Sequence, residues 1–315
     1  MDTYDVAIVG GGPAGLAAAM NTQLRGLSTV VFEAEAFGWQ LINLYPTKPV
    51  TNFPAQPELA SGELARRLAD QAAHFGAELA EYEAVEYVGR EHGQFKLRTD
   101  KRELRAESLI LALGLGRFTP RKLGLTDEDR FLGSGLTYRL PKLEEISAKR
   151  VVIVGGGDSA VDTALSLERV AEVTLVHRGE ALRACAHSQT CLQDSGVRLL
   201  TNAQVVGLGG AELLEQVIVS LEDESSLEIQ ADLLLVSVGQ VPDLRGVQGW
   251  DLPLGDPRQP VNSAMETGID GVFAVGDFAA YPGKVKQIAT AVAEGSTAAA
   301  AAERFLMMGG LVRAA

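Results

Sequence analysis

The chain has 315 residues, of which 46% are hydrophobic and 22% charged, and its formal net charge is −13. This length favours two domains, each able to bury its own core. The acidic balance argues against nucleic-acid binding, because neutralising phosphates takes a dense basic face. Two cysteines favour a reducing compartment over a disulfide framework. No leader pattern precedes the first strand and the apolar run at 297–302 is too short to span a bilayer, so a cytoplasmic location is expected.

A strand–helix–strand pattern occurs twice in the chain. Residues 4–9 and 28–33 are typical of buried strands and flank a helix rich in Ala and Leu at 13–25. The second copy comprises strands at 150–154 and 172–177 around a helix at 158–170. A βαβ unit implies a parallel sheet. The sequence therefore predicts an α/β protein with two Rossmann-like dinucleotide-binding domains of the three-layer ββα type.

Further elements suggest how the two copies are connected. Apolar strands at 108–114 and 233–239 each end in Gly and are interpreted as the crossovers between domains. Residues 262–277 are expected to form one last strand that ends in Gly-Asp, followed by an Ala-rich helix at about 285–307.

This order implies that one domain is inserted in the other. We expect a discontinuous first domain of residues 1–116 and 242–315, and a second domain of residues 117–241 inserted in it.

The first glycine-rich turn carries Gly10, Gly12 and Gly15 in GxGxxG register. Such glycines permit a tight turn, let a pyrophosphate approach the backbone at a helix N-terminus, and let helix and strand pack closely. Glu33 ends the second strand, where an acid accepts hydrogen bonds from a ribose hydroxyl. The combination favours a dinucleotide site over a Gly-rich turn without a ligand.

The second glycine-rich turn carries Gly155, Gly157 and Ala160 at the corresponding spacing. No acid stands at the ribose position, and Arg178 and Arg183 follow the second strand. Arginine there suits a 2′-phosphate, which predicts NADPH rather than NADH, whereas the alternative is a solvated surface pair.

The ordered motifs resemble the low-molecular-weight thioredoxin reductase group of flavoproteins over essentially the whole chain. They are the first turn, Glu33, the strand that ends at Gly114, the second turn and the GVFAVGD segment at 271–277. The resemblance implies FAD on the first domain, with Asp277 near the ribitol and flavin phosphate, NADPH on the second domain, and a homodimer. It implies no catalytic side chain, because the cofactors carry the chemistry.

The resemblance also implies further cofactor contacts in a flavin loop at 37–55, in the two turns and at the start of the last helix. These residues are Pro13, Ala14, Trp39, Gln40, Leu41, Tyr45, Asn52, Ala84, Ala112, Asp158, Ser159, His177, Gly276, Gln287 and Ile288.

The chain departs from that group in its cysteines. The CxxC dithiol is missing, and Cys185 and Cys191 lie six residues apart beyond the second turn, where they are expected to be buried or idle thiols. Without a dithiol, electrons cannot pass to thioredoxin by exchange. The body of the chain is most similar to the thioredoxin-reductase-like ferredoxin (flavodoxin)–NADP⁺ reductases, although no aromatic residue follows Phe305.

Two further departures concern the cofactor sites. Gly179 stands where the group usually has a second Arg, and Trp39 stands where its loop has Gly. The Trp39 indole is expected either to stack on the flavin or to pack within the loop.

The leading hypothesis is an FAD enzyme that moves electrons between NADPH and ferredoxin or flavodoxin. An acidic carrier would dock on a basic patch, for which the candidates are Arg117, Arg121, Lys122, Lys284 and Lys286. The alternatives are a reductase of quinones, free flavins or oxygen, and an FAD protein with a degraded NADPH site. The four His are scattered, so no metal site is expected.

Overall fold

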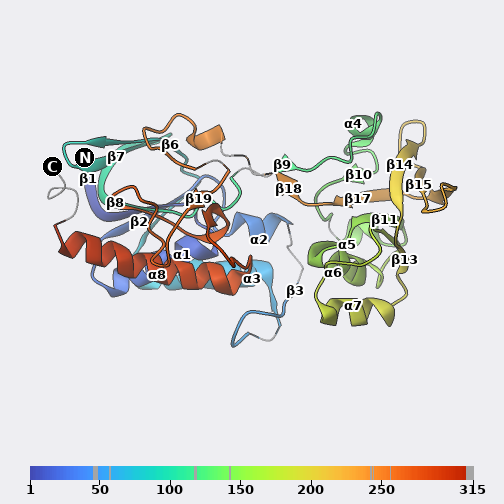
Figure 1. Ribbon diagram of the computed structural model, residues 1–315, viewed down its shortest axis with the longest axis horizontal. Helices are drawn as coiled ribbons and strands as arrows, with labels where there is room; N and C mark the ends of the chain where they lie inside the picture. Colours follow the sequence, from blue (N-terminus) through green and yellow to red (C-terminus); the bar gives the residue numbers. More distant parts are fainter. Residues whose placement is uncertain are drawn as a thin grey trace. The chain divides into compact units, whose positions relative to one another are not determined.

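A computed structural model describes residues 1–44, 49–56, 58–116, 119–141, 143–241, 243, 245–255 and 257–309. The chain divides into two compact units (Figure 1). Unit 1 comprises Met1–Phe118 and Pro242–Ala315, and unit 2 comprises Thr119–Val241.

Unit 1 is built on one sheet with strand order β5-β2-β1-β8-β7-β6, and β20 pairs with β8 as well. β5, β2, β1, β8 and β20 run parallel, whereas β7 and β6 continue the sheet as an antiparallel hairpin. The strand bounds are β1 Asp2–Val9, β2 Thr29–Glu33, β5 Glu78–Glu81, β6 Val85–Glu91, β7 Gln94–Thr99, β8 Glu103–Leu111 and β20 Val272–Ala274.

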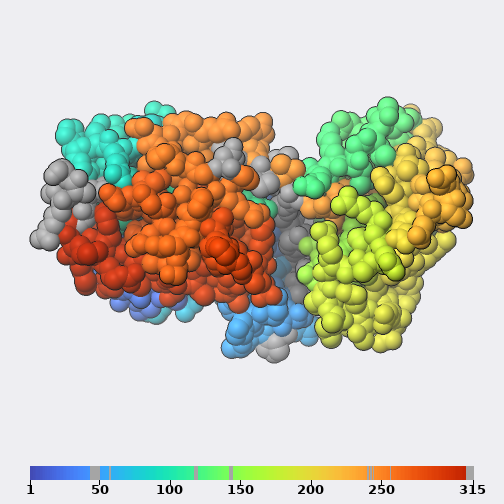
Figure 2. Space-filling view, viewed as in Figure 1, coloured from blue at the N-terminus to red at the C-terminus, as the bar shows by residue number. Residues whose placement is uncertain are grey.

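The helices α1, α3 and α8 pack together on one face of this sheet (Figure 1). In the space-filling view, α8 and the segments before it form much of the visible face of unit 1 (Figure 2). The remaining elements are α1 Pro13–Leu24, α2 Trp39–Leu44, β3 Pro49–Val50, β4 Leu59–Ala60, α3 Ser61–His74, η1 Arg245–Val247, β19 Gln259–Pro260, η2 Gly276–Phe278, β21 Ala279–Ala280 and α8 Ile288–Met307.

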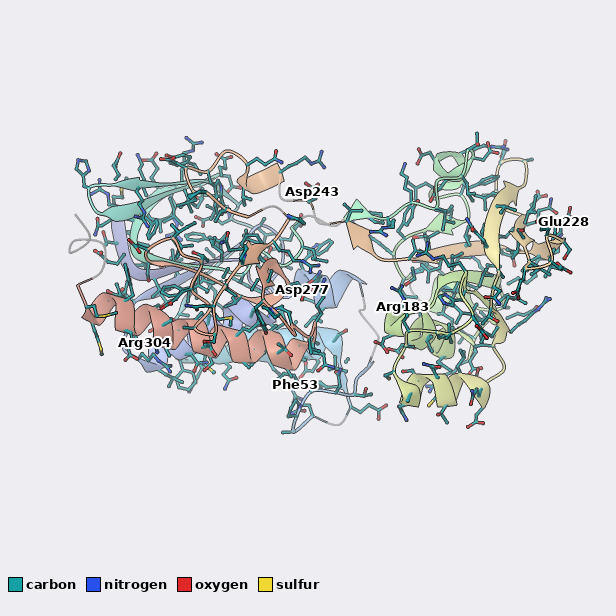
Figure 3. All side chains as sticks on the ribbon, in the orientation of Figure 1. Phe53, Arg183, Glu228, Asp243, Asp277 and Arg304 are labelled. Carbon is teal, nitrogen blue, oxygen red and sulfur yellow. The ribbon has the colours of Figure 1, made fainter. Side chains whose placement is uncertain are left out.

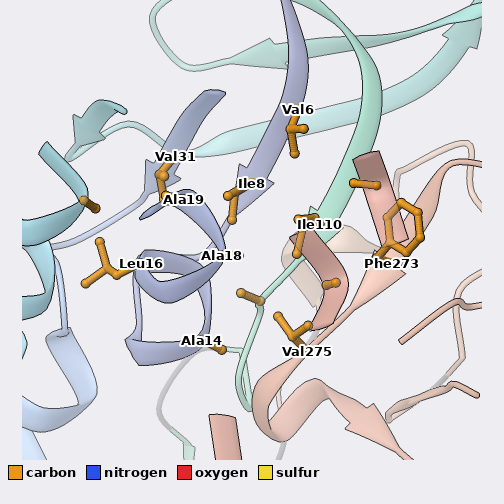
Figure 4. Close-up of a cluster of buried hydrophobic side chains, with 14 of the residues drawn as sticks. Val6, Ile8, Ala14, Leu16, Ala18, Ala19, Val31, Ile110, Phe273 and Val275 are labelled. Atoms are coloured by element: carbon orange, nitrogen blue, oxygen red, sulfur yellow. The ribbon is translucent and has the colours of Figure 1, made fainter. Parts of the chain in front are cut away.

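The alternation of side chains along β1 divides the core of unit 1 into two layers. Val6 and Ile8 face the helices and pack with residues of α1 and α8 (Figure 4). Ala7 and Val9 face the other way, into a cluster with Phe95 and other residues of β7 and β8. A strand buried on both faces reads as a continuous apolar run, which is why residues 4–9 are recognisable from sequence.

Unit 2 has a parallel sheet of strand order β10-β17-β11-β12-β13 and a separate antiparallel meander β14-β15-β16. Val152 and Val154 of β11 face the cluster that includes the meander, whereas Val151 and Ile153 face the helices. The unit bounds are β9 Thr119–Pro120, α4 Glu128–Phe131, β10 Leu136–Thr137, α5 Leu143–Ile146, β11 Arg150–Gly155, α6 Asp158–Leu167, β12 Glu172–Val176, α7 Ala186–Gln193, β13 Arg198–Leu200, β14 Gln204–Gly209, β15 Gln216–Ser220, β16 Ser226–Gln230, β17 Leu233–Ser237 and β18 Gln240–Val241.

The α/β class and the two Rossmann-like domains, the second inserted in the first, are confirmed. The prediction that 262–277 forms a strand is wrong for most of its length, because only Val272–Ala274 pairs with β8. Asn262 and Thr267 instead bind nearby backbone groups through their side chains, which holds this segment in turns. Among the described residues, no helix is long and apolar enough to cross a membrane.

Candidate functional site

The first glycine-rich turn leads directly from β1 into α1. Gly10 has φ +108°, and a Cβ there would lie 2.2 Å from the carbonyl oxygen of Ala112. A Cβ on Gly15 would lie 1.9 Å from the carbonyl oxygen of Gly10. A Cβ on Gly12, in contrast, would meet nothing within 4 Å. Two of the glycines are thus required by close packing within the turn, and the third keeps an open space in front of the helix.

That open space adjoins the N-terminus of α1. Gly12 is the N-cap and provides no side-chain hydrogen bond, Pro13 occupies the first turn, and Ala14 is buried behind it. The first N–H groups of a helix have no partner within the helix and carry partial positive charge. The geometry therefore fits the pyrophosphate of a dinucleotide.

Glu33 lies at the end of β2 beside this turn. Its Oε2 accepts a hydrogen bond of 2.8 Å from the backbone N–H of Gly11, and its Oε1 accepts one of 3.1 Å from Glu35. Burial raises the pKa of the Glu33 carboxyl, although these N–H donors act in the opposite direction. A carboxylate held in this way can still accept hydrogen bonds from the hydroxyls of a ribose.

Ala84 and Ala112 lie on segments adjoining the same turn. Ala84 follows Glu83, whose N–H donates to the carbonyl oxygen of Glu33. Ala112 follows β8, and its N–H donates to the carbonyl oxygen of Val9. The structure thus brings both residues to the carboxyl ends of β1 and β2.

The flavin loop expected at 37–55 is partly described. Trp39 and Gln40 are half-buried at the start of α2, and a Cβ on Gly114 would lie 3.9 Å from Gln40 Oε1. Leu41 is buried, and its carbonyl oxygen accepts a hydrogen bond from Ser61. Asn52 is exposed. Tyr45 lies outside the described residues.

Gly276 and Asp277 follow β20 and lie close to α1. A Cβ on Gly276 would approach the Cβ of Ala14 to 3.1 Å, so this turn lies against the first residues of α1. Asp277 is half-buried, and no hydrogen bond or ion pair of its carboxylate is found among the described residues (Figure 3). This carboxylate is therefore available to a ligand.

Glu294 of α8 anchors this turn, a role that the sequence patterns did not indicate. Its buried carboxylate accepts hydrogen bonds from the N–H of Gly276 at 2.7 Å, from the hydroxyl of Tyr281 at 2.5 Å and from Lys284. The combination of an acid in an Ala-rich helix with a Lys ten residues earlier is the signal that could have pointed to it.

The start of α8 carries the last expected contacts. Gln287 is the exposed N-cap and provides no side-chain hydrogen bond to the helix, and Ile288 is half-buried. Burial lowers the pKa of the nearby Lys286 ammonium; Arg258 and Lys284 lower it further, and Asp277 opposes them.

The basic patch expected from sequence is contradicted at two of its members. Lys284 is buried in an ion pair with Glu294, and Lys122 pairs with Asp129. Arg121 and Lys286 are exposed, and Arg117 lies outside the described residues. An acidic neighbour in the folded chain neutralises each of the two contradicted lysines, which spacing along the sequence did not reveal.

The second glycine-rich turn leads from β11 into α6. A Cβ on Gly155 would lie 2.7 Å from the carbonyl oxygen of Ser237 and 2.5 Å from the Cβ of Ala160. A Cβ on Gly157 would meet nothing within 4 Å, and Gly157 is an N-cap without a side-chain hydrogen bond. Unit 2 therefore has its own open space in front of a helix N-terminus.

Asp158 and Ser159 form the first turn of α6. The Asp158 Oδ1 accepts a hydrogen bond of 2.7 Å from the N–H of Cys185, and the carbonyl oxygen of Gly156 accepts one of 2.6 Å from the N–H of Arg183. Ser159 is half-buried. These bonds hold the segment before α7 beside the turn.

His177 follows β12 and packs beneath the second turn. A Cβ on Gly156 would lie 2.1 Å from His177 Nδ1, and His177 Nε2 is 3.1 Å from the carbonyl oxygen of Ala181. Arg178 and Arg183 are exposed, and no hydrogen bond or ion pair of either guanidinium is found among the described residues. Figure 3 labels Arg183. Two uncommitted guanidinium groups of this kind suit a phosphate.

Neither cysteine is buried, so of the two expected alternatives, buried or idle thiols, the first is wrong and the second stays a prediction. Cys185 is exposed at the N-cap of α7, and Cys191 is half-buried within that helix. The reason is that α7 packs against α6 and buries Ser188 and Leu192, whereas Cys185 and Cys191 lie at other positions of the helix. Among the described residues, no group of three or more His, Cys, Asp or Glu side chains could hold a metal ion.

Comparison with known proteins agrees with this geometry. The chain is similar to ferredoxin–NADP reductases of Streptococcus pyogenes serotypes M2 and M3, each 39% identical over 301 residues that cover 94% of this chain and 91% of the relative. Among solved structures it is similar to thioredoxin reductase from T. acidophilum, with 25% identity and a TM-score of 0.88 over 98% of this chain and 100% of the other. It is also similar to thioredoxin reductase from Lactococcus lactis, with 28% identity and a TM-score of 0.86 over 97% of this chain and 99% of the other. Residues 4–295 match the family model of the pyridine nucleotide-disulphide oxidoreductases. The chain therefore belongs to the pyridine nucleotide-disulphide oxidoreductase family.

Proposed function

We propose that the protein is an FAD-dependent oxidoreductase that moves electrons between NADPH and a one-electron carrier of the ferredoxin or flavodoxin type. The observation that carries this proposal is the pair of glycine-rich turns, each with an open space at an uncapped helix N-terminus. One turn has a carboxylate for a ribose and the other has two uncommitted arginines.

FAD is assigned to unit 1 because the residues there fit a dinucleotide with a flavin. The N-terminus of α1 would hold the pyrophosphate, Glu33 the adenosine ribose, and Asp277 the ribitol region. Gln40, Leu41 and Gly114 would border the ring system, and the start of α8 would close it. When bound, the flavin accepts a hydride from a nicotinamide and passes on single electrons.

NADPH is assigned to unit 2 for the corresponding reasons. The N-terminus of α6 would hold its pyrophosphate, and Arg178 and Arg183 would bind the 2′-phosphate. His177 would contribute beside this site, where its ring lies against Gly156 and its Nε2 is near the carbonyl oxygen of Ala181.

The acceptor is proposed to be a carrier protein and not thioredoxin. The curated relatives are named ferredoxin–NADP reductases, and the chain has no CxxC. Cys185 and Cys191 are free thiols six residues apart and do not form a CxxC, so they are not expected to replace that dithiol.

The thiols can be tested directly. We expect the double substitution Cys185→Ser and Cys191→Ser to leave the rate of NADPH oxidation unchanged, measured with ferricyanide as an artificial acceptor. A lost rate would show that the thiols take part in electron transfer.

The decisive experiment is an anaerobic titration of the FAD-loaded protein with NADPH and then with NADH. We expect NADPH to bleach the flavin absorbance at lower concentration than NADH. Failure of both nucleotides would favour an FAD protein whose second site is degraded, a reading for which Gly179 is the motive. Turnover with ferredoxin, quinone and oxygen would then separate a carrier reductase from a reductase of small acceptors.

Two roles are proposed for Trp39 at the flavin site, stacking on the flavin ring or packing within the loop. Its position at the start of α2 is consistent with stacking on the ring and with packing in the loop. Flavin fluorescence of Trp39→Gly separates them, because loss of a stacked indole raises the emission. We also propose a homodimer in the cytoplasm, and sedimentation of the purified protein would test the assembly.

A further inference from the structure

We propose that Glu294, acting with Lys284, is the positioning group that holds the Gly276–Asp277 turn ready for the ribitol and flavin phosphate of FAD. The inference rests on the proposed FAD site in unit 1. It assigns a role to a buried ion pair that no nucleotide-binding motif contains.

The first support is the cost of the arrangement. The side chains of Lys284 and Glu294 are 10% and 5% exposed, so both charges are removed from water. Such burial is unfavourable for each ion, and the attraction between the ions offsets it only when further hydrogen bonds complete the site. The structure supplies those bonds, since the Glu294 carboxylate also accepts from Tyr281 and from Gly276.

The second support is where the pair acts. Glu294 accepts the N–H of Gly276 at 2.7 Å, and Lys284 Nζ donates to the carbonyl oxygen of the same residue at 2.7 Å. Both backbone polar groups of one glycine are therefore held by one ion pair. Gly276 has φ +67°, one of several conformations open to a glycine, so these bonds select a single backbone conformation for the turn.

The third support is the contrast between Glu294 and Asp277. The Glu294 carboxylate is fully engaged by protein donors and is not available to a ligand. Asp277 is the next residue after the pinned glycine, and its carboxylate has no partner among the described residues. Asp277 would therefore contact the cofactor, whereas Glu294 would act through the backbone of Gly276.

The placement of Glu294 on α8 connects the turn to the first helix. The adjoining Gly295 packs against α1 so closely that a Cβ would lie 2.3 Å from the carbonyl oxygen of Ala14. Ala14 also borders Gly276. The two groups proposed to bind FAD in this region, the N-terminus of α1 and Asp277, are thus held in register by neighbouring residues of α8.

Burial and the Glu294 carboxylate raise the pKa of Tyr281 to about 12. Tyr281 therefore remains a hydrogen-bond donor to Glu294 across the neutral range. The Tyr281 hydroxyl and the Lys284 ammonium both donate to Glu294. Neither donor is therefore expected to bind the cofactor directly.

The test compares Glu294→Gln with Glu303→Gln, the same change on the same helix. Glu303 forms a partly exposed ion pair of 3.2 Å with Arg25.

FAD is removed, and the affinities of each apoprotein for FAD and for AMP are measured by fluorescence and calorimetry. AMP carries only the adenosine half, which Gly12 and Glu33 would hold. We expect Glu294→Gln to weaken FAD binding by about 10- to 100-fold and AMP binding by less than twofold. Glu303→Gln should change neither by more than twofold.

Two controls keep the outcomes distinct. Asp277→Ala should weaken FAD binding; if the wild type and this variant bind FAD alike, or neither binds it, the proposed FAD site itself fails. If Asp277→Ala weakens FAD binding and Glu294→Gln does not, or if Glu294→Gln weakens the binding of FAD and of AMP equally, the positioning role is overturned.

If Glu294→Gln does not fold, the double variant Lys284→Met/Glu294→Gln replaces it, because no uncompensated charge then remains buried. The same FAD-specific loss is expected of the double variant.

Discussion

The two glycine-rich turns have the same strand–turn–helix backbone arrangement, but different side chains border them. Val9 pairs with Phe32 in unit 1, and Val154 pairs with Val176 in unit 2. The next residue of each second strand therefore occupies an equivalent position: Glu33 in one unit and His177 in the other. The carboxylate receives the N–H of Gly11, whereas the imidazole packs on Gly156. One unit thus provides a charged acceptor at this position, and the other leaves recognition to the arginines beyond it.

The first residues of the two helices differ as well. Pro13 is neutral at the start of α1, whereas Asp158 places a carboxylate at the start of α6. A fixed negative charge beside a phosphate site weakens phosphate binding, because like charges repel. This difference suits a cofactor that stays in unit 1 and one that leaves unit 2 after each turnover.

The largest effects should follow from filling the open spaces. A Cβ at Gly12 or Gly157 would meet no protein atom within 4 Å, so we expect the fold to accept Asp there, with its carboxylate in the proposed phosphate position. We expect Gly12→Asp to abolish FAD retention and Gly157→Asp to weaken NADPH binding at least 100-fold while FAD remains, as measured by absorbance and calorimetry. Gly249→Asp, at another open position, is the control. Loss of FAD from Gly157→Asp would contradict the assignment of one nucleotide to each unit.

The third position of each motif should tolerate substitution to different degrees in the two units. A Cβ on Gly15 would collide with the carbonyl oxygen of Gly10 at 1.9 Å, whereas unit 2 accommodates Ala160 at the same place. We expect Gly15→Ala to destabilise unit 1 by on the order of 3 kcal/mol and to release FAD. Ala160→Gly should lower stability by only about 1 kcal/mol. Thermal melts monitored by circular dichroism would measure both, and equal losses would show that the helices pack alike in the two units.

The arginines of unit 2 should separate the two nicotinamide cofactors. Arg178→Ala removes a charge-assisted contact to a 2′-phosphate, which NADH lacks. We expect the KM for NADPH to rise about tenfold or more while the KM for NADH stays within twofold. Arg198→Ala, an exposed position of the same unit, is the control. A parallel rise for both nucleotides would place the 2′-phosphate elsewhere.

The smallest effect is expected at Asp158. Asn keeps the acceptor for the N–H of Cys185 and removes the charge next to the phosphate site. We expect Asp158→Asn to tighten NADPH binding by about two- to fivefold, in line with a single charge at an exposed helix end. Stopped-flow kinetics should show the gain mainly in slower NADPH dissociation. Unchanged or weaker binding would mean that the phosphate lies away from this carboxylate.

The sequence by itself determined the elements whose signals are local. Each βαβ unit was recognisable because a strand buried on both faces is a continuous apolar run, and because the glycines at its end are spaced for contacts made within a few residues. Gly10, Glu33 and their counterparts in unit 2 followed from that spacing. The absence of a CxxC is likewise a property of the sequence alone.

Only the tertiary structure decided which side chains are already engaged by others. Lys284 looked like a free surface cation and is instead buried against Glu294, ten residues away. The place of His177 against Gly156, where its ring leaves no room for a Cβ, was likewise not visible in the sequence, and its contact with the nucleotide stays a prediction. The antiparallel β14-β15-β16 meander was not recognised either, because its strands are half-buried and its pairing is long-range. Burial and ion pairing depend on residues that folding brings together, so they have no signature in local spacing.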